Sequence, residues 1–304
     1  MKSESRSRQI GKDRIFTTVN YMLFGLFTVI CIYPFYYLVI NTISANDLSA
    51  AGEINLIPQG IHFENYKSLI VIRGLLRATI ISFSKMIIGT GLTVAGSAFL
   101  GYMFTQDKMW KRKFWYRFVI ITMYFNAGLI PMFLTMKNLH LTNTFWVYVI
   151  PTIVQPFSII LVKTYVESIP KELQEAAQID GAGIIMIFLK IILPACTPIL
   201  ATVAIFAAVN QWNSYQDTLI YITDQKLYSL QYLLYTYINQ ANSLAAMVKN
   251  SSGTALSSTV MATRETGTSI RMTVSVMVVL PILCIYPMFQ RFFVKGIMIG
   301  AVKG

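Results

Sequence analysis

Residues 175–194 read EAAQIDGAGIIMIFLKIILP, and in them a polar segment rich in small residues runs directly into an apolar stretch. A helix is favoured before the glycines, because Pro170 suits a first helical turn and the carboxylates of Glu172 and Glu175 complement the helix dipole in the early turns. The glycines of DGAG then break the helix. The sequence therefore predicts a short helix, a glycine turn and a second helix that leads into an apolar span.

One face of the predicted short helix is small and shallow. Leu173, Ala176, Ala177 and Asp180 recur at i, i+3, i+4 and i+7, which is the spacing of residues on one side of a helix. Side chains this small contribute little to a hydrophobic core. The face is better suited to docking against another surface.

The chain as a whole has the composition of a membrane protein. Of its 304 residues, 55% are hydrophobic and 12% are charged, whereas soluble domains carry roughly 25% charged residues. The net charge of +12 does not indicate nucleic-acid binding, because lysine and arginine cluster at the ends of apolar stretches and form no basic face. The first apolar run, residues 15–43, lacks a small-residue cleavage site, so we expect it to stay in the membrane as an anchor.

Six apolar stretches reach the length of about 20 residues that a transmembrane helix needs. They are residues 15–43, 76–104, 114–136, 144–166, 191–213 and 269–293. Basic residues concentrate in the N-terminal segment, in the connection at 105–117, around the segment quoted above and after the last stretch. The positive-inside rule places these four regions in the cytoplasm. The sequence therefore predicts an all-α integral membrane protein with six transmembrane helices and both termini in the cytoplasm.

This topology divides the chain into three parts. Residues 1–14 form a cytoplasmic N-terminal segment, residues 15–294 a six-span domain and residues 295–304 a cytoplasmic tail. Inside the six-span domain, we expect a cytoplasmic loop at 168–194 and an outward loop at 214–268.

One further helix is predicted outside the spans, and one span carries several glycines. Residues 218–238 are apolar but are interrupted by Asp224, and their leucines recur at helical spacing, so we expect an amphipathic helix at the outer membrane surface. The second stretch carries glycines at positions 89, 91, 96 and 101. These residues would let another helix approach closely.

The sequence shows no catalytic chemistry of its own. It has no phosphate-binding loop of the Gly-x-x-x-x-Gly-Lys-Ser/Thr type. Its two histidines, His62 and His140, are isolated, so we expect no metal site and no catalytic residue. The predicted spans have no Asp or Glu in their cores, where proton-coupled carriers usually place relay groups. Lys85 is the one charge well inside a span; we expect its ammonium to extend toward the outer surface, with the lining of a cavity as the alternative.

At the segment quoted first, the sequence resembles a known family. The inner-membrane permease subunits of binding-protein-dependent ABC importers carry the EAA loop, EAA-x3-G-x9-I-x-LP. Seven specified positions match it at fixed spacing, and they are Glu175, Ala176, Ala177, Gly181, Ile191, Leu193 and Pro194. The resemblance implies the type I ABC importer permease fold, in which this loop is the cytoplasmic coupling helix.

Other stretches are similar to the carbohydrate branch of this family, specifically to the MalG-like subunits of the maltose-type transporters. These stretches are NQWNSY at 210–215, the long outward loop and the ending FVKGIMIGAVKG. The ending departs from the plain maltose pattern, which carries a threonine. It looks like the ending of permeases for complex plant or host oligosaccharides, so we do not expect maltose as the substrate.

The resemblance implies a permease subunit in a bacterial cytoplasmic membrane. Its expected partners are a second permease in a heterodimer, two ATPase subunits, an extracellular sugar-binding protein or lipoprotein, the oligosaccharide substrate and the lipid bilayer, with no nucleic acid. The chain itself is expected to bind no cofactor, because ATP and Mg belong to the ATPase. The residues implied in ATPase coupling are Glu175, Ala176, Ala177, Asp180, Gly181, Leu193 and Pro194. The tail residues implied in ATPase contact are Lys295, Gly296, Gly300, Lys303 and Gly304.

Sugar recognition normally combines aromatic stacking with amide and hydroxyl hydrogen bonds. Residues of this kind gather near one membrane face at Asn210, Gln211, Trp212, Asn213 and Tyr215. They are candidates for the substrate pathway. For the two aromatic residues, membership of the interfacial aromatic belt is the alternative.

Two other classes of function stay open at this point. One is an ABC importer permease for a non-sugar solute, because the EAA loop alone does not specify carbohydrate. The other is a self-contained secondary carrier, against which the missing relay groups argue.

Overall fold

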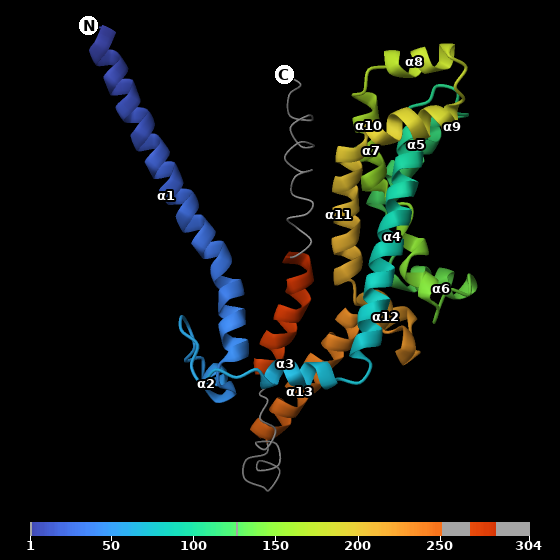
Figure 1. Ribbon diagram of the computed structural model, residues 1–304. Helices are drawn as coiled ribbons and strands as arrows, with labels where there is room; N and C mark the ends of the chain where they lie inside the picture. The colour runs from blue at the N-terminus through green and yellow to red at the C-terminus, as the bar shows by residue number, and fades with distance from the viewer. Residues whose placement is uncertain (1, 126, 251–267, 284–304) are drawn as a thin grey trace. The chain divides into compact units, whose positions relative to one another are not determined.

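The computed structural model describes residues 2–125, 127–250 and 268–283, and in these ranges the ordered elements are helices. The chain divides into two compact units, Met1–Val71 with Ile238–Val279 and Ile72–Tyr237 with Leu280–Gly304. Figure 1 shows the helices in chain order by colour. Among the described residues, two helices are long and apolar enough to cross a membrane, Phe16–Ile43 and Leu75–Met103, and the number rises to four if each of two bent helix pairs is one span.

In the first unit, a long apolar helix leads into a polar connection. α1 (Lys2–Ile43) contains Phe16–Ile43, and α2 (Asn46–Ala51) and α3 (Glu64–Val71) follow it. Buried amides fix this connection: the Asn41 side chain donates to the carbonyl oxygen of Ile54 (3.2 Å), and that of Asn65 donates to the carbonyl oxygen of Thr42 (2.9 Å). The carbonyl of Thr42, in the last turn of α1, thereby gains a partner, and the Ile54 carbonyl in the connection is tied to α1.

The second unit is built around α4 (Leu75–Met103), which packs against α7 (Pro156–Glu167) and α11 (Thr197–Asn213) (Figure 1). A Cβ added at Gly101 would lie 2.8 Å from a methyl carbon of Val162, and one added at Gly96 would lie 2.7 Å from the carbonyl oxygen of Ile153. The predicted close helix approach is confirmed at these glycines. At Gly91 it is not, because a Cβ there would meet nothing within 4 Å.

The two bent pairs are irregular where they bend. The first joins the 3₁₀ turns η1 (Phe145–Tyr148) and η2 (Ile150–Thr152) to α7 at an angle of 43°. The second joins Ile184–Ala195 to α11 at 79°. Its first arm consists of α9 (Ile184–Ile187), the π-helical turn η3 (Phe188–Ile192) and α10 (Leu193–Ala195).

Two predicted elements are divided in the structure. The expected span at 114–136 becomes α5 (Arg112–Tyr124) and α6 (Leu129–Asn138), because Phe125 is extended and Gly128 has a φ of 86°. The prediction of a single amphipathic helix at 218–238 is wrong. The chain forms α12 (Gln216–Tyr221), the short 3₁₀ turn η4 (Gln225–Leu227) and α13 (Leu230–Asn250).

The physical reason for the second division lies in the backbone between α12 and η4. The side chain of Asn143 accepts hydrogen bonds from the amides of Thr223 (3.0 Å) and Asp224 (2.8 Å), and the Asp224 carboxylate caps the amide of Lys226 (2.8 Å). Side chains thus take the place of helical partners at this point.

The described part of the C-terminal apolar stretch is a helix at Thr268–Leu283. The tail residues Lys295, Gly296, Gly300, Lys303 and Gly304, and the outward-loop residues 251–267, lie outside the described residues.

Candidate functional site

The segment quoted at the start of the sequence analysis forms a short helix with a defined end. α8 (Glu172–Ile179) begins after Lys171 and ends where Asp180 donates its amide to the carbonyl oxygen of Ala176 (3.1 Å). Gly181 then adopts a φ of 81°, and Ala182 donates back to the carbonyl oxygen of Ala177 (2.9 Å). Positive φ is unfavourable for residues with a Cβ, so glycine is what allows the chain to turn toward α9.

α8 divides its residues between an inner and an outer side. Ala177 packs against the hydrophobic cluster that contains Ile187 and Val166. Glu175 and Ala176 are exposed, and Ile179 is 87% exposed. The Ile179 side chain is therefore accessible to another surface.

Ile179 was absent from the residues proposed from the sequence. It follows Ala176 at a spacing of three and is the last apolar residue before the glycine turn. Those two facts were available from the sequence and would have placed it on the outer side of the helix.

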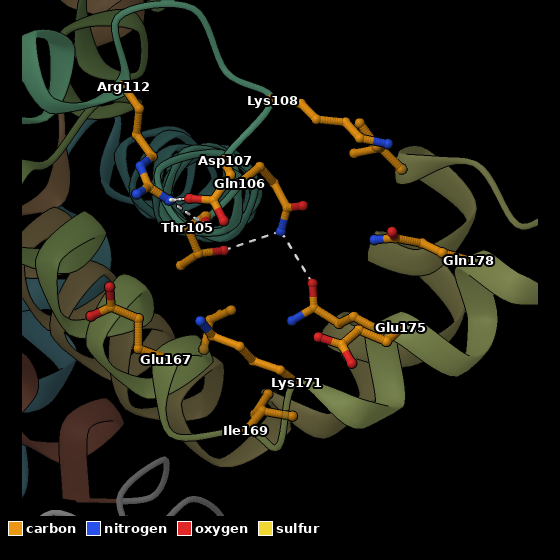
Figure 2. A pocket seen from close by; sticks show the side chains of 13 residues that line it. Thr105, Gln106, Asp107, Lys108, Arg112, Glu167, Ile169, Lys171, Glu175 and Gln178 are labelled. Carbon is orange, nitrogen blue, oxygen red and sulfur yellow. Dashed lines mark hydrogen bonds and ion pairs between the residues drawn. The ribbon is translucent and has the colours of Figure 1, made fainter.

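A groove of about 520 Å³ separates α8 from the C-terminal end of α4 and the connection to α5 (Figure 2). One hydrogen bond bridges the groove: the Gln106 amide donates to the side-chain oxygen of Gln174 on α8 (3.2 Å) and also to the hydroxyl of Thr105 (3.2 Å). This bond links α8 to the connection that follows α4, in addition to the backbone connections of α8 with α7 and α9.

The charges around the groove are of both signs. Arg112 pairs with Asp107 (2.8 Å) and donates to the carbonyl oxygen of Thr105 (2.7 Å), which holds the connection after α4 in place. Lys163 pairs with Glu167 at 2.8 Å. Glu175 lines the groove (Figure 2), and it has no ion pair with any residue of the described ranges. Its carboxylate is therefore available to a partner.

Leu193 and Pro194 lie away from the surface of α8. Leu193 packs against the hydrophobic cluster of the second unit, and both residues belong to α10, directly before the 79° bend into α11. They position the bend that connects α8 and α9 to the long helix α11.

The five residues proposed for the substrate pathway fall into separate environments. Gln211 is buried and donates to the carbonyl oxygen of Tyr148 (3.0 Å) and the hydroxyl of Thr152 (2.9 Å). Trp212 is buried with its ring against that of Phe83, with the ring centroids 5.2 Å apart. These two side chains hold helices together.

The other three of these residues are accessible to different degrees. Asn210 and Asn213 are exposed, and Tyr215 is half-buried. The Tyr215 ring stacks on that of Tyr235 with a centroid distance of 4.7 Å. Asn210 and Asn213 therefore keep the exposure that contact with a substrate requires.

The expectation for Lys85 is wrong. The side chain does not extend to a surface, because it is 0% exposed and its ammonium donates to the carbonyl oxygen of Ser214 at 2.7 Å. The ammonium also lies 5.0 Å from the centroid of the Tyr148 ring. A carbonyl at the C-terminal end of α11 and an aromatic face together replace the water that the charge loses.

No group of three or more His, Cys, Asp and Glu residues that could hold a metal occurs among the described residues.

Comparison with known proteins places the chain among transport proteins. Residues 94–299 match the family model described as the binding-protein-dependent transport system inner membrane component. Over 96% of its length, the chain is 29% identical to the whole of the polygalacturonan/rhamnogalacturonan transport system permease protein YtcP of Bacillus subtilis (strain 168). It is 31% identical to Protein LplC of the same organism, with 96% of each chain covered.

A solved structure supports the same placement. The chain is 27% identical to, and superposes with a TM-score of 0.74 on, a subunit from the crystal structure of a bacterial ABC transporter involved in the import of the acidic polysaccharide alginate. The superposition covers 93% of this chain and 98% of that one.

Proposed function

The chain belongs to the family of binding-protein-dependent transport system inner membrane components, and we propose that it is the permease subunit of an importer that takes up an oligosaccharide. As a family member it is a multi-pass protein of the cytoplasmic membrane, a non-enzymatic subunit of an ABC transporter. The proposal adds the class of substrate and the roles of individual residues. It assigns the hydrolysis of ATP to two separate ATPase subunits.

The proposed topology has six spans, with both termini in the cytoplasm. Phe16–Ile43, Leu75–Met103, the two bent pairs and the apolar helix at Thr268–Leu283 supply five of them, and α5 with α6 supplies the remaining one. The side chains of α1 from Phe16 to Phe35 are largely exposed and apolar, which suits contact with lipid or with a second permease.

The observation that carries the proposed mechanism is the outer side of α8. It presents Ile179, Ala176 and the Glu175 carboxylate, which has no ion pair within the described residues, on a helix that continues into α7 and α9 and is hydrogen-bonded through Gln174 to the connection after α4. We propose that this surface docks into a cleft of an ATPase subunit, with Ile179 covered and Glu175 paired with a basic residue.

Transport then follows from linkage between two conformations. Closure of the ATPase dimer around ATP moves α8, and the connections of α8 transmit this movement to the spans, so the pathway opens alternately outward and inward. ATP binding can shift this equilibrium only to the extent that it favours one conformation over the other. This transmission requires that α8 be firmly attached to the spans, because a mobile helix would move without displacing them.

The remaining proposed contacts are with protein partners. A second, different permease completes the pathway, an extracellular sugar-binding protein delivers the substrate to the outward loop 214–268, and the tail 295–304 reaches the ATPase. The tail carries the glycines and lysines noted in the sequence, which suit close contact with a partner.

Purification of the intact complex tests this function. Affinity purification of the chain from its native membrane should bring a second permease and an ATPase, which mass spectrometry would identify. In proteoliposomes with its binding protein, the complex should take up one or more of a panel of neutral and uronate-containing oligosaccharides only when ATP is supplied. Uptake by the chain alone without ATP would contradict the proposal, as would uptake of a non-sugar solute only.

A further inference from the structure

A basic and aromatic surface lies on the connection from α4 to α5 and on the first turns of α5. Its side chains are all exposed, and they are the cations Lys111, Lys113 and Arg117 and the rings of Trp110, Phe114 and Phe118. We call these six residues the basic–aromatic surface. α5 itself has no buried residue, so this side of the helix is open to another molecule.

The three cations of this surface have no acidic partner among the described residues. The nearest acid in the sequence, Asp107, is bound to Arg112 at 2.8 Å, and residues 108–124 contain no acid. The Lys111 ammonium lies 4.7 Å from the centroid of the Trp110 ring, and this contact does not neutralise its charge. The basic–aromatic surface therefore attracts an anion.

The cations and the rings form two adjacent stripes along α5. Lys113 and Arg117 are four residues apart, and so are Phe114 and Phe118, so each pair shares one side of the helix. Phe114 is 58% exposed and Phe118 is 51% exposed. Helices that lie at a membrane–water interface combine basic and apolar stripes in this way, because phosphate headgroups and acyl chains meet there.

The charge of the neighbouring helix favours lipid over the ATPase as the occupant. On α8, Glu172, Glu175 and the C-cap Asp180 are exposed. A cleft that carries a basic residue to pair with Glu175 would be repelled by the basic–aromatic surface, because like charges oppose each other across an interface. Lysine and arginine clusters directly cytoplasmic of a span attract anionic lipid headgroups. The exposed rings of α5, which belongs to a proposed span, suit the acyl chains below those headgroups.

The inner side of α5 fixes this surface to the rest of the second unit. The centroid of the Tyr116 ring lies 5.6 Å from that of Phe104 and 4.7 Å from the ammonium of Lys163 in α7. In the connection directly before α5, Gln106 donates to Gln174 of α8 (3.2 Å). A molecule bound to the basic–aromatic surface therefore restrains a segment that is hydrogen-bonded to α8.

We propose that the basic–aromatic surface binds the phosphate headgroup of an anionic phospholipid in the cytoplasmic leaflet, and that this lipid positions the connection bonded to α8. The cations bind the phosphate, and the rings pack against the upper part of the acyl chains. The proposal rests on the proposed function, which places α8 and this end of α5 on the cytoplasmic side. Anionic lipid is then required for efficient stimulation of the ATPase, although it contacts only the permease.

Lipid titration of the purified complex tests the proposal. The complex and its binding protein are studied in nanodiscs of phosphatidylcholine with increasing shares of phosphatidylglycerol, the probe. Native mass spectrometry counts the bound phosphatidylglycerol, and the ATPase is measured with liganded binding protein. The triple variant Lys111→Gln/Lys113→Gln/Arg117→Gln should bind this lipid at least tenfold more weakly, since each engaged cation contributes a factor of about five. Its ATPase should need a correspondingly larger share of phosphatidylglycerol.

Three controls accompany the triple variant. Lys67→Gln/Lys137→Gln/Lys226→Gln removes the same number of exposed cations from the connections proposed to face outward, and its ATPase should respond to the lipid as wild type does. Inorganic phosphate should not replace phosphatidylglycerol, because it offers the rings no acyl chain. Gln106→Leu should bind the lipid normally, yet its ATPase should lose the response to it.

The possible outcomes separate the lipid site from the proposed function. The same lipid binding and ATPase response in the triple variant as in wild type overturns the site, and so does a wild-type complex that does not respond to phosphatidylglycerol. Photoreactive benzoylphenylalanine in place of Phe114 should crosslink to phospholipid. Crosslinks only to the ATPase or the second permease overturn the proposal, because the surface is then a protein contact.

Two further results concern the parts of the proposal. A full lipid response of the Gln106→Leu complex overturns the link to α8. A complex that binds phosphatidylglycerol through these cations but takes up no oligosaccharide contradicts the proposed function and still supports the lipid site.

Discussion

The ammonium of Lys85 in α4 donates a hydrogen bond of 2.7 Å to the carbonyl oxygen of Ser214, directly after α11. Ser214 in turn donates its hydroxyl to the carboxylate of Asp217 in α12. Ser214 thus connects the Lys85 ammonium to the Asp217 carboxylate. In the same region, Tyr148 bonds to Thr218 (2.9 Å), so α4, η1, α11 and α12 form one buried polar network.

Lys85→Met should weaken this network. The change leaves the Ser214 carbonyl without its donor and the Asp217 carboxylate without the nearby cation, which is expected to cost about 1–3 kcal/mol. The purified complex should therefore unfold at a lower temperature, measured by a thermal shift. Lys226→Met is the control, since Lys226 is exposed.

Addition of Asp217→Asn to Lys85→Met should restore part of the lost stability. The double variant removes both charges, and buried pairs tolerate joint removal better than the loss of one partner. Additive losses in the double-mutant cycle would show that Lys85 and Asp217 do not interact.

Glu175→Lys should release or uncouple the ATPase while the permease stays in the membrane. Reversal of a charge in a partly desolvated pair costs more than the roughly 0–1 kcal/mol of a surface pair. ATPase co-purification and sugar uptake measure the effect. Glu172→Lys, at the start of α8, should be milder. Wild-type behaviour of Glu175→Lys would exclude this carboxylate from the docking surface.

Ile179→Asp should reduce ATPase association at least tenfold, because burial of a side chain of this size contributes about 1.5–3 kcal/mol. Its 87% exposure in the chain means that the folding of α8 itself should be little affected. Ile179→Leu keeps the apolar volume and should bind the ATPase normally. Equal binding by both variants would show that Ile179 lies outside the contact.

Gly181→Val should displace α8. With a φ of 81° at this position, a β-branched residue costs on the order of 1–3 kcal/mol. No neighbouring atom lies within 4 Å of an added Cβ, so any effect comes from the backbone. Proteolysis of the loop in membrane vesicles should speed up, and uptake should fall. Gly183→Val, at a negative φ of −72°, is the matched control.

Cysteine labelling tests the topology. Gln225→Cys lies in the exposed turn η4 of the proposed outward loop, and Gln178→Cys lies on exposed α8. An impermeant thiol reagent should label the first in intact cells and the second only after the membrane is opened. The reverse pattern would place α8 outside the cytoplasm and remove the basis of its proposed role.

The sequence was most informative where a pattern is local. The long apolar runs foretold α1 and α4, and glycine in DGAG foretold the turn after α8, because hydropathy and backbone freedom act within a few residues. The partners of Lys85 could not be foreseen: Ser214 lies 129 residues along the chain, and only the packed fold brings the two together.

The division of the predicted 218–238 helix shows a similar limit. Its hydrophobic period is helical on both sides of the break, and what interrupts it is the side chain of Asn143, about 80 residues earlier. A capping partner supplied from another segment leaves no signal in the local pattern. Ile179 was overlooked for a different reason. The face predicted for α8 ended with Asp180, and Ile179 directly precedes that residue in the sequence.

The glycine contacts of α4 restrict where the permease can move. A Cβ at Gly96 would lie 2.7 Å from the carbonyl oxygen of Ile153, which precedes α7, and one at Gly101 would lie 2.8 Å from the side chain of Val162 in α7, so α4 approaches this segment closely at both glycines. A shift of α4 along this segment would bring larger side chains against these close contacts and is therefore disfavoured. We therefore expect α4 and α7 to move together, and the displacement in the proposed transport cycle to occur at other surfaces.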